Sequence, residues 1–134
     1  MTDVFVGRLM SSPVVSVTAD TPAQEAATRL LDRDISSLVV TDAENDLVGI
    51  LTTTDFVRMI ADETVAAETT VADYMTTSVV TVTANDSVDA VAETMVQRGF
   101  HHLPVVDDES GVIGMVTTTD VTAYVSHIES PPAA

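Results

Sequence analysis

The chain repeats itself at a spacing of 65 residues, and this repeat is its most constraining feature. The stretch GILTTTD (49–55) returns as GMVTTTD (114–120). Sliding the sequence by this spacing aligns residues 6–60 with 71–125 without a gap, and about 18 of the 55 aligned positions are identical. Self-similarity of this length indicates two copies of one supersecondary unit.

Each copy has the hydrophobic pattern of a β-α-β-β-α unit. Short β-branched runs indicate strands, and apolar residues at helical spacing follow the helix starts Thr21–Pro22 and Asp86–Ser87. The expected strands are Val14–Val17, Leu38–Thr41 and Leu47–Leu51, then Val79–Val82, Leu103–Val106 and Val112–Val116. A last helix begins within each TTTD run. One copy alone would leave a face of its sheet uncovered. We therefore expect a mixed α/β (α+β) fold whose two repeats pack through their sheets about a pseudo-twofold axis.

The repeat also sets the expected boundaries. Repeat 1 covers residues 6–60, a polar linker covers 61–70, repeat 2 covers 71–125, and a C-terminal tail covers 126–134. A chain of 134 residues is long enough to bury a substantial core.

The charge excludes some partners. Five arginines and no lysine stand against 21 acidic residues, for a net charge of -16. Such a chain repels nucleic acid and anionic lipid, because binding a polyphosphate requires cations that displace its counterions. A generally acidic surface would explain the charge, but we favour adaptation to a salt-rich cytoplasm, where salt screens the self-repulsion. In this respect the composition resembles that of a halophilic archaeal protein.

The remaining composition favours a cytoplasmic protein. The chain has no cysteine, which excludes disulfides and thiolate chemistry. No apolar run approaches the roughly 18 residues that a membrane span needs. The first ten residues have neither the basic patch nor the apolar block of a signal peptide.

The motifs of the repeat resemble a known family. LPVVD (103–107) followed by the pattern G-h-h-T-x-x-D, within paired β-α-β-β-α copies, is similar to the CBS domain, named after cystathionine β-synthase. Two such domains in tandem resemble a Bateman module, here a stand-alone one. The resemblance implies binding of AMP, ADP, ATP or S-adenosylmethionine in clefts between the repeats. It also implies a regulatory rather than catalytic role and pairing of modules into a homodimer.

The TTTD run allows two interpretations. A threonine followed three residues later by an acid is a helix-capping pattern. A helix start also attracts phosphate, and a carboxylate one turn on can accept from both hydroxyls of a ribose. In the family the threonine meets phosphate and the aspartate meets ribose, which implies these roles for Thr52 with Asp55 and for Thr117 with Asp120. We expect both functions together, with ligand binding the reason for the repetition.

The resemblance further implies two sites whose residues cross between the repeats. Site A would combine Thr52, Asp55, Val80, Thr81, His101, His102, Leu103 and Pro104. Site B would combine Val15, Ser16, Ser36, Ser37, Thr117 and Asp120. The histidines stand where family members often carry a side chain that contacts phosphate. The serines bring no charge, so site B is expected to be the weaker.

Other candidate residues have simpler explanations. Neighbouring strand residues point to opposite faces, so His101 and His102 make a poor metal chelate, and His127 is too isolated to complete one. We expect no metal. Arg58, one turn into its helix, is a further candidate for phosphate contact. The apolar residues of the last helix in each repeat, Phe56, Met59 and Ile60 with Val121, Tyr124 and Val125, are candidates for a dimer face.

These observations leave three classes of function. The first is a non-catalytic sensor of an adenosine ligand, with AMP or ADP favoured over ATP by the negative charge, that signals to a separate enzyme or transporter. The second is a structural or partner-docking module with vestigial ligand sites. A nucleotide hydrolase is disfavoured, because the sequence has neither a nucleophile with its base nor a glycine-rich phosphate loop.

Overall fold

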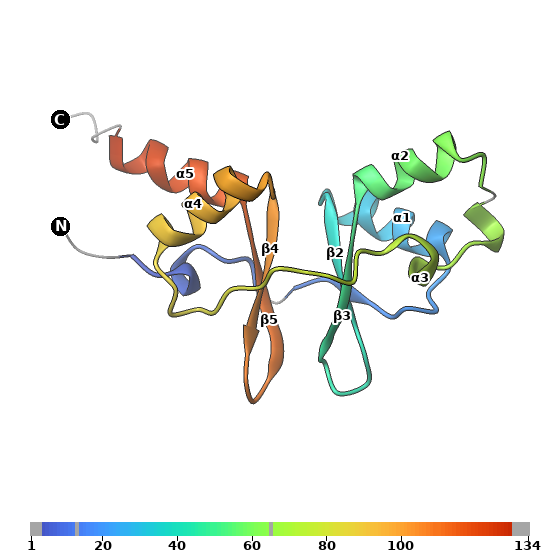
Figure 1. Ribbon diagram of the computed structural model, residues 1–134, viewed down its shortest axis with the longest axis horizontal. Helices are drawn as coiled ribbons and strands as arrows, with labels where there is room; N and C mark the ends of the chain where they lie inside the picture. The colour runs from blue at the N-terminus through green and yellow to red at the C-terminus, as the bar shows by residue number, and fades with distance from the viewer. Residues whose placement is uncertain (1–3, 13, 65, 130–134) are drawn as a thin grey trace. The chain divides into compact units, whose positions relative to one another are not determined.

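The structure is a computed structural model that describes residues 4–12, 14–64 and 66–129 (Figure 1). Its elements, in chain order, are η1 (Val6–Arg8), β1 (Ser16–Val17), α1 (Ala23–Arg33), β2 (Ser37–Thr41), β3 (Leu47–Thr52), α2 (Thr53–Ala61), η2 (Ala66–Glu68), α3 (Val71–Tyr74), α4 (Val88–Arg98), β4 (His102–Asp107), β5 (Gly111–Thr117) and α5 (Thr118–Glu129). The mixed α+β class is confirmed, and the order of elements is doubled except that the expected strand Val79–Val82 does not form. The expected C-terminal tail falls partly in α5, and residues 130–134 lie outside the described residues.

The two sheets differ at their first strand. In the first sheet β1 runs parallel to β2, and β2 is antiparallel to β3. The second sheet pairs β4 with β5, and a single parallel bridge between Val82 and Val105 takes the place of a first strand. The N–H of Val39 donates to the Val15 carbonyl at 3.4 Å. The equivalent donor in the second repeat would be Pro104, which has no N–H, so that ladder cannot extend.

The chain divides into two compact units whose boundaries differ from those of the repeats. One unit joins the described residues up to position 12 with 80–109 and 113–129, and the other joins 14–64 and 66–79 with 110–112. Residues 110–112 belong to the second unit because Asn45 Nδ2 donates to the carbonyls of Ser110 at 2.8 Å and Val112 at 2.9 Å. In Figure 1, α4 and α5 lie on one side of the β4–β5 hairpin, and α1 and α2 lie in the same relation to β2–β3.

Each unit has its own apolar core. In each core, one residue comes from the opening segment of the other repeat. The core of the first unit contains Val6 from η1 with Val82, Val91, Met95, Leu103, Val105 and Val116. The core of the second contains Val71 from α3 with Val17, Ala26, Leu30, Leu38, Val40 and Leu51. Val6 and Val71 are equivalent positions, and each packs against the body of the other repeat. The short segment that opens each repeat therefore completes the core of the other repeat.

Two equivalent glycines permit this exchange. A Cβ on Gly49 would lie 2.8 Å from the carbonyl oxygen of Thr76, and one on Gly114 would lie 2.9 Å from that of Ser11. The strand backbone at both places pairs with the incoming segment, as in the 3.0 Å hydrogen bond from the Ile50 N–H to the Thr76 carbonyl. The glycine of the repeated G-h-h-T-x-x-D motif is thus required by the close approach of two backbones.

Candidate functional site

The first TTTD run forms a capped strand-to-helix junction. Thr52 ends β3 in an extended conformation, and Asp55 lies in the first turn of α2. Asp55 Oδ2 accepts hydrogen bonds from the Thr52 N–H at 2.8 Å and from its hydroxyl at 3.4 Å. This reciprocal arrangement satisfies helix-start donors that would otherwise lack partners. The capping interpretation is therefore confirmed.

Asp55 also has an ionic partner within its own helix. Arg58 donates from a guanidinium nitrogen to Asp55 Oδ1 at 3.0 Å. The Asp55 side chain is 3% exposed, while that of Arg58 is 63% exposed. Both oxygens of a nearly buried carboxylate are consequently occupied, one by the helix cap and one by the guanidinium.

The second TTTD run repeats the cap without the ion pair. Asp120 Oδ2 accepts from the Thr117 N–H at 2.8 Å and from its hydroxyl at 3.1 Å, and the Asp120 N–H donates to the same hydroxyl at 3.2 Å. Ala123 stands where the first repeat has Arg58. Asp120 is half-buried, and within the described part of the chain its Oδ1 receives no hydrogen bond. One oxygen of this carboxylate remains available.

A third T-x-x-D sequence shows what the pattern does on its own. Thr70 and Asp73 open the four-residue helix α3, and Asp73 Oδ2 accepts from the Thr70 N–H at 3.0 Å. This cap lies outside the G-h-h-T-x-x-D motif, and the sequence analysis did not single it out. It provides an internal reference for capping without any predicted ligand role.

Within each unit, the helix start is tied to the segment that precedes the neighbouring strand. The Thr53 N–H donates to the Ser36 carbonyl at 3.1 Å, and the Thr118 N–H donates to the His101 carbonyl at 3.0 Å. Asp55 thus lies in the same unit as the serines, and Asp120 in the same unit as the histidines. The crossed combination of Asp55 with His101 remains a prediction.

The two histidines differ in environment. His101 is exposed, and His102 begins β4 half-buried. Burial lowers the pKa of His102 below its ordinary value of 6.5, and the neighbouring His101 lowers it further. At neutral pH His102 is therefore mostly uncharged, so it can meet a phosphate as a neutral N–H donor but brings little positive charge.

The other predicted site residues lie at strand starts or in the cores. Val15 and Ser16 lie at β1, and Ser37 begins β2 with 8% of its surface exposed. Val80 packs partly buried against the core of its unit, next to exposed Thr81. Leu103 and Pro104 are fully buried in β4. A role for any of them in lining an adenine site remains a prediction.

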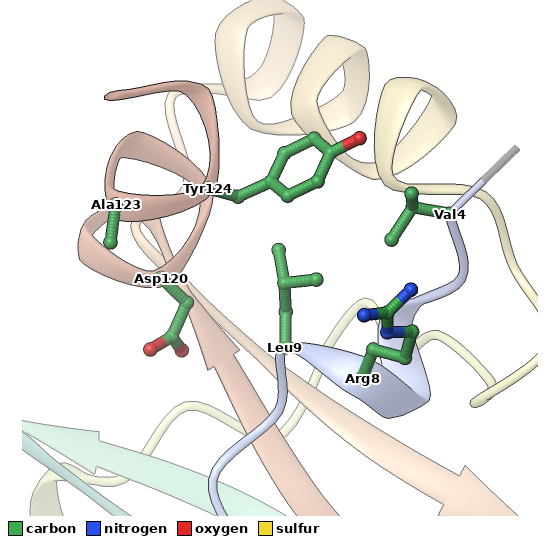
Figure 2. Close-up of a pocket in the computed structure, with 6 residues that line it drawn as sticks. All are labelled: Val4, Arg8, Leu9, Asp120, Ala123 and Tyr124. Carbon is green, nitrogen blue, oxygen red and sulfur yellow. The ribbon is translucent and has the colours of Figure 1, made fainter. Parts of the chain in front are cut away.

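A pocket of about 380 Å³ lies beside the second junction. Its walls are Val4, Arg8, Leu9, Asp120, Ala123 and Tyr124, all within one compact unit. In Figure 2, Leu9 stands between Arg8 and Asp120, and the ring of Tyr124 lies near its tip. The volume falls within the range of small-molecule sites. The sequence analysis missed Arg8 because η1 and α5 lie at opposite ends of the chain.

Among the residues with described side chains, which exclude His127, no three His, Asp or Glu side chains gather as a set of metal ligands. No helix in the described ranges has both the length and the apolar character needed to cross a bilayer.

Comparison with known families and relatives gives consistent matches. The family model for the CBS domain matches residues 6–62 and 71–127. The inosine-5'-monophosphate dehydrogenase of Nitrosopumilus maritimus is 32% identical over 116 residues, which are 87% of this chain and 23% of the enzyme. Two relatives from Methanocaldococcus jannaschii are also longer, and the chain spans 40% and 22% of their lengths.

Solved structures share the same fold. The CBS domain pair of protein MJ0100, in complex with 5'-methylthioadenosine and S-adenosyl-L-methionine, is 30% identical with a TM-score of 0.86. The match covers 93% of this chain and 98% of that one. CBSX2 in complex with AMP is 24% identical with a TM-score of 0.79, covers 94% and 98% of the two chains, and shows the likeness of fold.

Proposed function

This chain belongs to the CBS domain family, and from that premise we propose that it binds adenosine-containing ligands as a regulatory module without catalytic activity. The doubled junction is the observation that carries the proposal. In each copy a threonine ends a strand and an aspartate closes the next helix start. Such a helix start attracts phosphate, and the carboxylate can accept from vicinal ribose hydroxyls. The two adenosine compounds bound by the CBS pair of MJ0100 support this ligand class.

We propose for the two sites the residue combinations that the resemblance implies. Site A combines Thr52 and Asp55 with the segments around Thr81 and His101, and site B combines Thr117 and Asp120 with Ser16, Ser36 and Ser37. The negative charge favours AMP or ADP over ATP, because each added phosphate raises the repulsion. Such a ligand regulates a separate enzyme or transporter only if it binds one conformation more tightly than the other.

A partner-docking module is the second candidate, and one observation favours it. Large apolar side chains are exposed on the helices of both units: Leu31 by 82%, Val57 by 64%, Ile60 by 79%, Val96 by 83% and Val125 by 43%. Leu31 and Val96 are equivalent in the repeat, as are Ile60 and Val125. Exposed apolar side chains at matching places favour a protein contact. The proposed contact is a second copy of the chain, which gives a homodimer of modules.

Calorimetric titration with AMP, ADP, ATP and S-adenosylmethionine, in molar potassium chloride, tests the adenosine proposal. The variants are Asp55→Asn and Asp120→Asn, because the asparagine oxygen can still accept from the threonine N–H but accepts less strongly from a diol. Asp73→Asn is the matched control, since it removes the same charge at a cap without a predicted ligand role.

We expect at least one adenosine ligand to bind, and each site variant to weaken its own site about tenfold or more, since a hydrogen bond to a charged group contributes about 1.5–3 kcal/mol. The control should leave affinity unchanged. A folded protein that binds none of the four ligands would refute the sensor and favour the docking module.

A further inference from the structure

The two carboxylates of the doubled junction differ in what a ligand would have to displace. At Asp55, Oδ2 accepts from the Thr52 N–H and Oδ1 accepts from Arg58 at 3.0 Å. At Asp120, Oδ2 makes the same cap, while Oδ1 receives no hydrogen bond within the described residues. The chain therefore contains one closed and one open version of the same site.

A single position accounts for the difference. Arg58 and Ala123 are equivalent residues in the two repeats, three residues after the aspartate. At this spacing on a helix the two side chains are neighbours, so arginine can reach the carboxylate and alanine cannot. Arg58 is also one of only five cationic residues, excluding histidine, in a chain of net charge -16. Paired with a nearly buried carboxylate, it is a cation that becomes available when a ligand takes that carboxylate.

Displacing Arg58 has a different outcome for neutral and anionic ligands. A ribose that takes both oxygens of Asp55 must remove a charge-assisted hydrogen bond, which is stronger than a neutral one. A neutral nucleoside has no anionic group with which the released guanidinium can pair. A nucleotide carries a 5'-phosphate on the same sugar, and this phosphate can pair with the released guanidinium. Arginine pairs well with phosphate.

We propose that Arg58 is a charge-selecting residue of the Asp55 site, which transfers its guanidinium from Asp55 to the phosphate of an incoming nucleotide. The Asp55 site then selects phosphate-bearing adenosine ligands over neutral ones. The Asp120 site, with alanine at the equivalent place, has no ion pair to displace and accepts neutral adenosine compounds more readily, and Arg8 in the wall of its pocket does not bond the carboxylate. This inference rests on the proposed function and assigns a ligand class to each site.

The test compares AMP with adenosine, which differ only in the phosphate. Calorimetry is done at moderate salt on Asp120→Asn, so that the Asp55 site alone is read, with and without Arg58→Ala. We expect Arg58→Ala to weaken AMP and to strengthen adenosine, each by about three- to tenfold, as befits a partly exposed ion pair. The reciprocal variant, Ala123→Arg on Asp55→Asn, should weaken adenosine at the Asp120 site.

Arg33→Ala is the matched control, because it removes the same charge from an exposed position on α1 in the same unit. It should change neither the AMP affinity nor the adenosine affinity of the Asp55 site. Tighter binding of both ligands by Arg58→Ala would show a simple competitor and overturn the transfer. Equal effects of Arg33→Ala and Arg58→Ala would reduce the effect to net charge and also overturn it. A parent chain that binds neither AMP nor adenosine would overturn this inference, whereas the proposed function falls only if ADP, ATP and S-adenosylmethionine also fail to bind.

Discussion

The aspartates of the doubled junction show how one side chain can serve structure and ligand binding together. Each caps a helix start through Oδ2. Whether Oδ1 has a partner then depends on the residue three positions later in the helix. The T-x-x-D spacing predicted the cap, and its recurrence with the preceding glycine motif predicted a second role. The pairing of Asp55 with Arg58 follows from helical spacing, but the burial of that carboxylate depends on tertiary packing and was not readable from the sequence.

Alanine substitutions separate the structural contributions of these caps. We expect Asp55→Ala to lower the free energy of unfolding by about 1–3 kcal/mol, because it removes a cap and an ion pair at a buried position. Asp120→Ala should cost about 1 kcal/mol, since it removes the cap alone at a more exposed position. Urea denaturation measures both. Asp73→Ala, at the exposed cap of α3, serves as the reference. A larger loss for Asp120→Ala than for Asp55→Ala would contradict this account.

At the scale of elements, the long periodic segments were predicted well and the short ones were not. The expected strand Leu38–Thr41 became β2 (Ser37–Thr41), and α1 and α4 begin directly after the predicted helix starts. The helices η1 and α3 span three and four residues, too few to show a period. Their packing against the opposite repeat was also unpredicted, because an apolar pattern identifies a buried face but not its partner.

The strand glycine gives a test at this scale. We expect Gly49→Ala to lower the free energy of unfolding by about 1–3 kcal/mol, because the new methyl group meets the Thr76 backbone. Gly99→Asn is the control. Its left-handed backbone tolerates asparagine, and a Cβ there meets nothing within 4 Å. Thermal or urea unfolding reads both variants. If Gly49→Ala left the free energy of unfolding unchanged, the two backbones would not approach each other as described.

At the scale of the whole molecule, the helices of both units carry apolar side chains that the described structure leaves exposed. The sequence predicted a dimer face from the last helices, but one of its members was wrong. Met59 is 2% exposed and belongs to the interior, because it lies on the inward side of α2. Ile60 is exposed as predicted, and Leu31 and Val57 are the other large apolar side chains exposed on the helices of that unit. Periodicity alone could not separate the inward from the outward side of so short a helix.

The dimer proposal has a direct check in solution. We expect the protein to sediment as a dimer, and the double variant Leu31→Glu with Ile60→Glu to sediment as a monomer, because two charges in an apolar contact carry a high desolvation cost. The control replaces exposed Thr28 and Asp32, also on α1, with glutamate and asparagine. A parent protein that stays monomeric at high concentration would contradict the proposal.

The central claim is that the doubled junction is where adenosine ligands bind. Hydrogen exchange of the backbone amides, with and without saturating AMP, tests it most directly at the peptides that contain Thr52–Asp55 and Thr117–Asp120. We predict that AMP slows exchange at one or both junctions and leaves the Thr70–Asp73 cap unchanged. Binding of AMP without protection at either junction, or with equal protection at all three caps, would contradict the claim.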